Sequence, residues 1–271
     1  MHKIILIIKE LFANLRIIFS VAKYESKASS QGHYLGLAWE ILNPLIQVAT
    51  YFLVFGIGLR QDREVGEGIP FLPWMLLGIS CWFFMNRATL EASKSISKKI
   101  KLVSKMKFPV SIIPAISIVN LLKSYVVMTS IALILLISVG IRPSIYWFQY
   151  FYYFFALITF LYFLALLNST ITILVSDFQF ILRSTMRILF YFSGAIWQIQ
   201  PGGAFPDFFV RILQLNPFFY IIEGFRDTFL SRSFFWERGI PTLFFWTLTI
   251  LIAIISSHLH LKFRSKFIDL T

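Results

Sequence analysis

The sequence predicts an all-helical integral membrane protein with six transmembrane helices in a single domain, 1–271. Of its 271 residues, 58% are hydrophobic and 14% are charged, whereas soluble domains average about 45 to 50% and 25%. The mean hydropathy of +0.75 indicates that most of the surface faces lipid. Six runs without Asp, Glu, Lys or Arg reach the roughly 18 residues that a membrane-crossing helix needs. These runs are 41–59, 68–86, 124–141, 143–176, 188–206 and 239–261.

The segment 3–28, before the first run, is predicted to be an amphipathic helix in the cytoplasmic interface. Lys9, Arg16 and Lys23 recur every seven residues, and Lys27 falls on the same helical stripe. Apolar residues occupy the other side of this helix, as in helices that lie flat on a membrane. The segment has two interpretations. It is only a lipid anchor, or it is an anchor that also surrounds the entrance of a pathway for an anionic substrate.

The loop 87–107 is predicted to contain a second cytoplasmic helix. Lys94, Lys98 and Lys101 share one stripe at helical spacing, and Pro109 ends the helix because proline cannot continue its hydrogen bonds. By itself a lysine face indicates contact with anionic lipid more often than a protein docking site. Composition does not decide between these two interpretations.

The segment 198–238, between the last two runs, is predicted to form a hairpin that dips into the outer leaflet. Its two short helices, near 205–215 and 218–230, meet at Asn216 and Pro217, and each is too short to cross a bilayer. The hairpin is either a lid over an exit or an interfacial cap, and we favour the lid.

Polar residues in or beside these apolar segments have structural and functional interpretations. Glu223 and Asp227 share a helix face but lie beside Arg226, which favours structural ion pairs over acid/base catalysis. Lys123 precedes the third run. If the third helix enters the membrane at Val110, the lysine is an intramembrane charge and a functional candidate. If the helix begins at Ser124, the lysine extends to the interface, and we favour this second interpretation.

The positive charge indicates the orientation of the chain. Its formal net charge is +12, and most Lys and Arg residues fall in 3–28, in 87–107 and near the C-terminus. Because cytoplasmic flanks of membrane helices collect Lys and Arg, both termini are predicted to be cytoplasmic. We see no signal peptide, since the only early apolar run, 4–8, is too short.

The sequence lacks the motifs of several kinds of chemistry. It contains no G-x-x-x-x-G-K-[ST] loop, so any ATP and Mg²⁺ must be bound by another subunit. Its single cysteine, Cys81, excludes a disulfide within the chain. His258 and His260, two residues apart, point to different faces of a helix, so no metal or other cofactor is expected. Nothing indicates nucleic-acid binding.

Several strings resemble those of one family. They are YLGLAW at 34–39, LNPL at 42–45, KMKFPV at 105–110, LNPFFY at 215–220 and EGFRD at 223–227. With the arrangement above, they resemble the membrane subunit of bacterial ABC exporters of cell-surface polysaccharides. The resemblance covers nearly the whole chain and is closest to the wall teichoic acid export permeases of Gram-positive bacteria. O-antigen and capsule permeases share most of these strings.

The resemblance implies a homodimer with two copies of a separate ATPase in the bacterial cytoplasmic membrane. Such a machine moves an anionic polymer linked to undecaprenyl pyrophosphate outward. The resemblance also changes the interpretation of the lysine-rich helix in 87–107. This helix becomes the coupling helix, which sits on the ATPase. The coupling residues are then Arg87, Leu90, Glu91, Lys94, Lys98, Ile100 and Lys101.

The expected path needs positive charge at its entrance and weak repeated contacts inside, because tight binding would stall a long polymer. Aromatic rings can stack on sugar carbons, although each ring could equally face lipid. The predicted entrance consists of Lys23, Lys27, Arg183 and Arg187; the lining of Tyr51, Phe52, Phe55, Phe190, Tyr191 and Trp197; and the outer gate of Asn216, Pro217, Glu223 and Arg226.

Two alternatives remain open at this point. One keeps the machine but changes the cargo to O-antigen or capsular polysaccharide. The other, from a different class, is an integral-membrane enzyme acting on polyprenyl-linked sugars. Such an enzyme needs an acidic or histidine-containing site at one interface, and the sequence does not indicate one.

Overall fold

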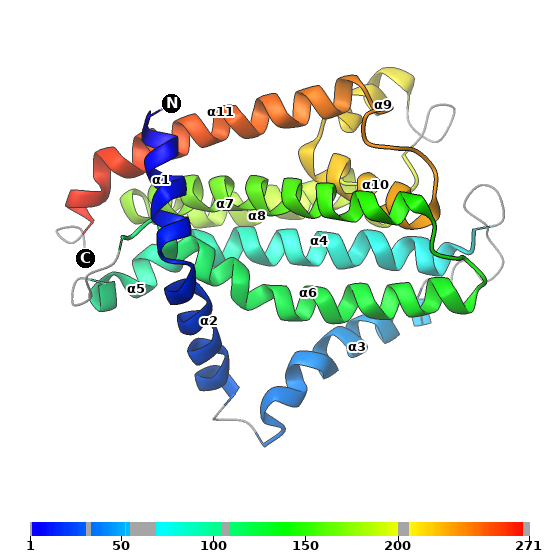
Figure 1. Ribbon diagram of the computed structural model, residues 1–271, viewed down its shortest axis with the longest axis horizontal. Helices are drawn as coiled ribbons and strands as arrows, with labels where there is room; N and C mark the ends of the chain where they lie inside the picture. Colours follow the sequence, from blue (N-terminus) through cyan, green and yellow to red (C-terminus); the bar gives the residue numbers. More distant parts are fainter. Residues whose placement is uncertain are drawn as a thin grey trace.

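A computed structural model describes residues 2–30, 34–51, 53–54, 69–103, 109–199 and 206–267 (Figure 1). Over these residues the chain is helical, without a strand, as predicted. The α-helices are α1 (His2–Ala13), α2 (Leu15–Ser30), α3 (Trp39–Tyr51), α4 (Phe71–Ser93), α5 (Ser95–Val103), α6 (Ile112–Ser138), α7 (Tyr150–Leu174), α8 (Phe178–Phe192), α9 (Asp207–Gln214), α10 (Pro217–Leu230) and α11 (Ile240–Phe263). Short 3₁₀ helices are η1 (Gly36–Ala38), η3 (Ile145–Gln149) and η4 (Arg264–Lys266).

The long helices α4, α6, α7, α8 and α11 lie side by side along the long axis of the molecule (Figure 1). Among the described residues, three helices are long and apolar enough to cross a membrane: Ile112–Ser138, Ile145–Leu174 and Ile240–Lys266. Helix α4 has 23 residues, which at about 1.5 Å each also span roughly 35 Å. Most of its residues are buried by the other helices, so its sequence need not be as apolar as a lipid-facing helix.

The bundle has two different ends (Figure 1). Helices α1 and α5 and the segment η4 lie at one end, which we call the terminal end. Helices α9 and α10 and the segment η3 lie at the other, which we call the α10 end. Lys3 and His258 are joined by a 3.2 Å hydrogen bond at the terminal end, so the beginning and the end of the described chain share one end of the bundle. This agrees with termini on the same side of a membrane.

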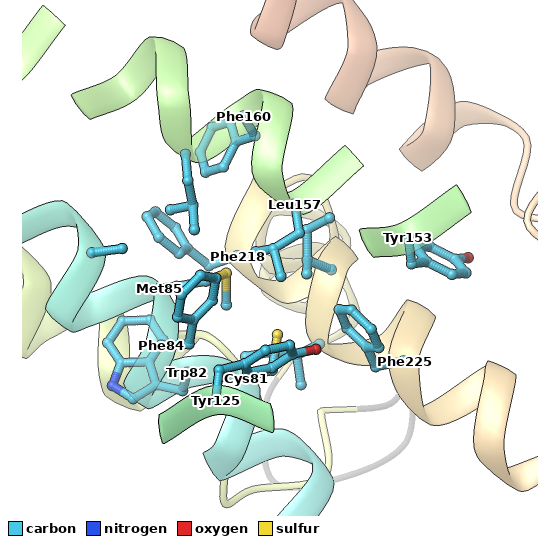
Figure 2. Close-up of a cluster of buried hydrophobic side chains, with 14 of the residues drawn as sticks. Cys81, Trp82, Phe84, Met85, Tyr125, Tyr153, Leu157, Phe160, Phe218 and Phe225 are labelled. Carbon is cyan, nitrogen blue, oxygen red and sulfur yellow. The ribbon is translucent and has the colours of Figure 1, made fainter. Parts of the chain in front are cut away.

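Aromatic side chains from four helices form the core (Figure 2). Phe84 of α4 and Tyr125 of α6 have ring centroids 4.7 Å apart. Phe218 of α10 contacts Trp82 of α4 at 5.7 Å and Phe160 of α7 at 5.5 Å, both edge to face. These distances are typical of favourable aromatic pairs. Helix α10 is therefore part of the bundle core.

Two predicted membrane runs, 143–176 and 239–261, correspond closely to single long helices, but a third prediction is wrong. Helix α6 begins at Ile112, not at residue 124, so Lys123 lies inside the apolar span. The helix continues through polar residues because α2 offers them partners. Lys123 Nζ donates a hydrogen bond to Ser26 Oγ at 2.5 Å. The predicted start of this helix at residue 124 is therefore wrong, and the position of Lys123 relative to a membrane stays a prediction.

The structure also differs from the predicted boundary between the apolar run 68–86 and the loop 87–107. Helix α4 continues to Ser93, and Arg87 and Glu91 pair on its surface at 3.2 Å, one turn apart. The separate helix is the shorter α5. Arg87, Leu90 and Glu91 therefore belong to the end of a bundle helix rather than to the predicted cytoplasmic helix.

The predicted fifth run, 188–206, starts too late. Helix α8 begins at Phe178 and carries Arg183 and Arg187, which we had placed in a loop. It ends before Gly194, whose φ of 71° is typical of the turn after a helix. Of the predicted first run, 41–59, the structure describes α3 and residues 53–54, and the rest lies outside the described residues.

The N-terminal segment forms two helices instead of one. Helices α1 and α2 are separated at Asn14, whose side chain donates to the carbonyl oxygen of Glu10 at 2.8 Å. Both helices run across the bundle axis at the terminal end (Figure 1). Ile18 of α2 is buried against Ile112 and Ile116 of α6. The segment therefore packs on the bundle, and its place in a membrane interface stays a prediction.

Candidate functional site

Helices α3, α4 and α8 line a groove of about 390 Å³. It brings together residues that we predicted for two different roles. Arg183 and Arg187 come from the predicted entrance, and Tyr51, Phe190 and Tyr191 come from the predicted lining. The remaining lining residues are Trp82, Phe83, Asn86, Leu90 and Met186.

Helix α8 supplies the charged wall of the groove because its sequence is amphipathic. Arg183, Arg187 and Tyr191 recur every four residues, so they lie on one stripe. Leu182 and Met186 are buried and attach α8 to the bundle, and Met186 also lines the groove. Since α8 runs from the terminal end toward the α10 end, the arginines lie nearer the terminal end and the tyrosine lies deeper (Figure 1).

Further positive charge lies near the terminal end of the groove. Partial burial and the positive charges of Arg183 and Lys98 together lower the pKa of Lys94, which joins α4 to α5. The side chain of Lys98 is itself exposed on α5. Cations from α5, from α8 and from the α4–α5 junction therefore gather on this side of the bundle, where an anion entering the groove would meet them.

The deeper part of the groove is aromatic. Trp82 and Phe190 have ring centroids 5.6 Å apart, Phe190 and Tyr191 5.4 Å, and Tyr51 and Phe83 5.7 Å. Trp82 also belongs to the core shown in Figure 2, which holds this wall in place. Such rings offer apolar faces with few hydrogen-bonding groups. They can contact the carbon skeleton of a ligand without selecting one position along it.

Other predicted entrance and lining residues lie elsewhere. Lys23 and Lys27 are exposed on α2 and are not part of the groove lining. Trp197 follows α8 and does not line the groove either. Phe52 and Phe55 lie outside the described residues.

Sequence reasoning missed the α4 wall of the groove. Trp82, Asn86 and Leu90 recur every four residues and face the groove together. We had assigned Leu90 to the coupling helix and had not singled out Trp82 or Asn86. The regular spacing of one polar and two large apolar residues was the available signal.

The predicted gate residues Asn216 and Pro217 begin α10. The Asn216 side-chain oxygen accepts a hydrogen bond from the Phe218 amide at 3.0 Å, and Pro217 occupies the first helical turn. The side-chain nitrogen of Asn216 donates to the carbonyl oxygen of Phe192 at 3.4 Å. This residue therefore attaches the hairpin to the end of α8.

Arg226 is fully buried and joins α10 to two other helices. Its guanidinium group donates to the carbonyl oxygens of Trp74 at 3.2 Å, Gly194 at 2.7 Å and Ala195 at 2.8 Å. It also binds the Glu223 carboxylate at 2.6 Å and lies 3.4 Å from the centre of the Trp74 ring. These contacts connect the beginning of α4, the turn after α8 and α10. A lid that moved alone would have to break them.

The acidic residues of α10 are held in ion pairs. Burial raises the pKa of Glu223, but the charges of Arg226 and Arg238 outweigh burial and lower it. Asp227 pairs with Arg238 at 2.5 Å. This arrangement is the structural pairing that the sequence favoured over catalysis. No three His, Cys, Asp or Glu side chains in the described ranges gather as a metal site.

Helix α5 presents one buried and one exposed side. Ile96 is fully buried with Ile113 of α6 and Phe267 after η4, whereas Ser97 and Lys98 are exposed at the terminal end. The side chains of Ile100 and Lys101 lie outside the described part of the helix. The exposed side of α5 is therefore available to a partner, and its buried side contacts the bundle.

The model of the family described as ABC-2 type transporter matches residues 16–230, which include the groove, α5 and α10. The chain belongs to the ABC-2 type transporter family. Similar proteins match most of its length. It is 25% identical over 240 residues to an O-antigen export system permease protein of Myxococcus xanthus, with 87% of this chain and 86% of the relative covered. A Klebsiella pneumoniae protein of the same description is 20% identical over 254 residues, which cover 92% and 93% of the two chains.

Membership of the ABC-2 family agrees with the apolar helices and identifies the chain as the membrane component of a transporter. The sequence contains no G-x-x-x-x-G-K-[ST] loop, so an ATP-driven transporter of this family that contains this chain would need a P-loop from another subunit. The likeness to wall teichoic acid permeases is a finer prediction, and both relatives carry the name of a different cargo.

Proposed function

We propose that this chain is the permease subunit of an ATP-driven exporter of a lipid-linked cell-surface polysaccharide. It works as a homodimer with two copies of a separate ATPase, which bind ATP and Mg²⁺. The observation that carries the proposal is the groove, in which two arginines precede a series of aromatic rings. The ABC-2 family and the names of the relatives support the same function.

In this proposal the terminal end faces the cytoplasm of a bacterium. The basic residues near both termini support this orientation. Helices α3, α4 and α8 join the three most apolar helices to give six spans, and α10 dips into the outer leaflet. The exposed side of α5 then docks on the ATPase.

Transport follows from the order of groups along the groove. Arg183 and Arg187 attract the pyrophosphate of the carrier lipid, because guanidinium groups bind phosphate oxygens in pairs. The polymer then slides over Tyr51, Phe190 and Tyr191, which stack weakly on its sugar or alditol carbons. ATP-driven closure of the partner pushes α5 and separates the two copies of the chain.

The cargo has two candidates within this function. The motif strings favour wall teichoic acid, a polyphosphate, whereas the relatives are named for O-antigen. Measuring which lipid-linked polymer stimulates ATP hydrolysis by the purified complex separates them. Stimulation by a glycerol-phosphate polymer supports teichoic acid, and stimulation by a neutral polysaccharide supports O-antigen.

The double variant Arg183→Gln/Arg187→Gln tests the groove itself. Losing two charge-assisted contacts to phosphate should lower export by about tenfold or more, while the complex still assembles and hydrolyses ATP. Arg142→Gln, an exposed arginine at the α10 end, is the matched control and should export normally. Unchanged export by the double variant, or purification of an active chain without any ATPase, would contradict the proposal.

A further inference from the structure

Glu25 is an acidic residue on a basic helix and forms a junction between three helices. Helix α2 otherwise carries Arg16, Lys23 and Lys27 as its charged residues. The Glu25 carboxylate lies 2.6 Å from Lys99 Nζ of α5. It also accepts a hydrogen bond from Asn120 Nδ2 of α6 at 2.8 Å. One side chain thus contacts both α5 and α6.

This junction lies beside a second contact between the same helices. Ser26, next to Glu25, accepts a hydrogen bond from Lys123 of α6. Ala22 and Ile18, one and two turns earlier on α2, are buried against α6. Helix α2 is therefore attached to α6 along its length, so that a force applied at Glu25 acts on α6 as well.

The described apolar contacts of α5 are with other parts of the bundle. Ile96 packs against Ile113 at the start of α6, Phe263 at the end of α11 and Phe267 after η4. Among the described side chains, Lys99 of α5 and Glu25 of α2 form an ion pair that joins the two helices. It is also partly shielded from water, since the two side chains are 20% and 31% exposed. Shielding makes an ion pair stronger than one at a fully exposed surface.

Motion of α6 can reach the groove through α4. Phe84 of α4 packs on Tyr125 of α6, and Trp82 and Asn86 on the same α4 helix line the groove. A displacement of α5 is therefore carried from Lys99 to Glu25, then through Asn120 to α6, and from α6 to the groove wall.

We propose that Glu25 is a positioning residue that couples movement of the ATPase-facing helix α5 to α2 and α6, and so to the groove. The inference rests on the proposed function, in which α5 receives the movement of the ATPase. Glu25 does not contact the polymer. It keeps three helices in register during each cycle, so its loss uncouples ATP hydrolysis from export without removing the binding site.

The test compares the ratio of polymer exported to ATP hydrolysed in vesicles that hold the complete complex. For Glu25→Ala and Lys99→Ala we expect normal assembly, basal ATP hydrolysis close to that of the wild type and an export ratio lower by about tenfold. Lys9→Ala, an exposed lysine of α1, is the matched control and should keep the ratio. If Glu25→Ala does not assemble, Glu25→Gln replaces it, because glutamine keeps the shape and removes the charge.

The exchanged pair Glu25→Lys/Lys99→Glu gives the decisive result. The Asn120 side-chain oxygen is buried without a hydrogen-bond partner, so it can accept from the new lysine. The exchange should therefore restore most of the export ratio that either single substitution removes. A wild-type ratio for Glu25→Ala, or no recovery in the exchanged pair, would overturn the inference. A wild-type complex that neither exports nor binds an ATPase would instead overturn the proposed function.

Discussion

Arg226 shows how a single residue stabilises the α10 end of the bundle. A buried guanidinium group is costly unless its donors are satisfied, and here three carbonyl groups and one carboxylate accept from it. Gly78 of α4 makes room for it, because a Cβ atom there would lie 2.2 Å from Arg226 Nη2. The carbonyls of Gly194 and Ala195 follow α8, where the helix dipole favours a positive charge. Arg226 is thus a structural part of the proposed gate.

Replacing Arg226 by methionine should destabilise the protein strongly. The substitution leaves the Glu223 carboxylate without its closest partner, and breaking such a buried pair costs about 3 to 5 kcal/mol. Thermal unfolding of the purified protein in detergent measures this as a lower midpoint. Arg232→Gln is the control, since Arg232 lies 3.9 Å from Glu223 and is partly exposed, and it should lower stability by about 1 kcal/mol or less. Equal unfolding midpoints for the two variants would show that Arg226 is not the main partner of Glu223.

Only part of the Arg226 site could be predicted from the sequence. The Glu223–Arg226 pair is visible because helical residues three apart are neighbours. The carbonyl acceptors of Trp74, Gly194 and Ala195 are not visible, because they are far away in the sequence and belong to the main chain. Burial of an arginine depends on such distant partners.

At the scale of helices, the sequence predicted the presence of apolar helices better than the residues at which they begin and end. Counting residues without charge found 143–176 and 239–261 because those helices face mostly lipid or core. The same count failed for α6 and α8, which contain Lys123, Arg183 and Arg187. In both helices the charged residues have a partner or a polar groove beside them. A charge therefore ends an apolar run in the sequence without ending the helix.

Helix α5 allows a paired test of coupling and folding. Lys98→Glu reverses an exposed charge, so it should leave the protein folded and abolish ATP-driven export. Ile96→Asp places a carboxylate among Ile113 and Phe267, where it has no partner, so it should lower stability and expression. Export in vesicles and the yield of folded protein by gel filtration distinguish the two effects. Normal export by Lys98→Glu would exclude this face of α5 as the ATPase contact.

At the scale of the whole molecule, two exposed arginines mark one side of a bundle whose surface is otherwise rich in large apolar residues. The groove opens on the side of α3 and α8, where Arg183 and Arg187 are exposed. Helices α7 and α11 expose large apolar residues, including Phe151 and Leu251, as expected of surfaces that face lipid. Five of the residues predicted for the path line the groove, whereas Lys23, Lys27 and Trp197 do not, and the sequence did not indicate that helix α4 would complete it. Which helices line the groove together depends on how they pack, and the periodicity of each single helix does not specify that packing.

The exposed arginines of the groove predict where the second copy of the chain lies. An arginine facing hydrocarbon costs about 2.5 to 3.5 kcal/mol, so a groove with two of them is unfavourable against lipid. A second copy placed over the groove would enclose it as a water-filled path. We therefore expect Tyr191→Cys, 54% exposed at the groove, to form a cross-linked dimer in native membranes in a Cys81→Ala background. Phe151→Cys, 71% exposed on α7, should stay monomeric under the same conditions. Cross-linking of Phe151→Cys alone would place the dimer contact on the opposite side and leave the groove open to lipid.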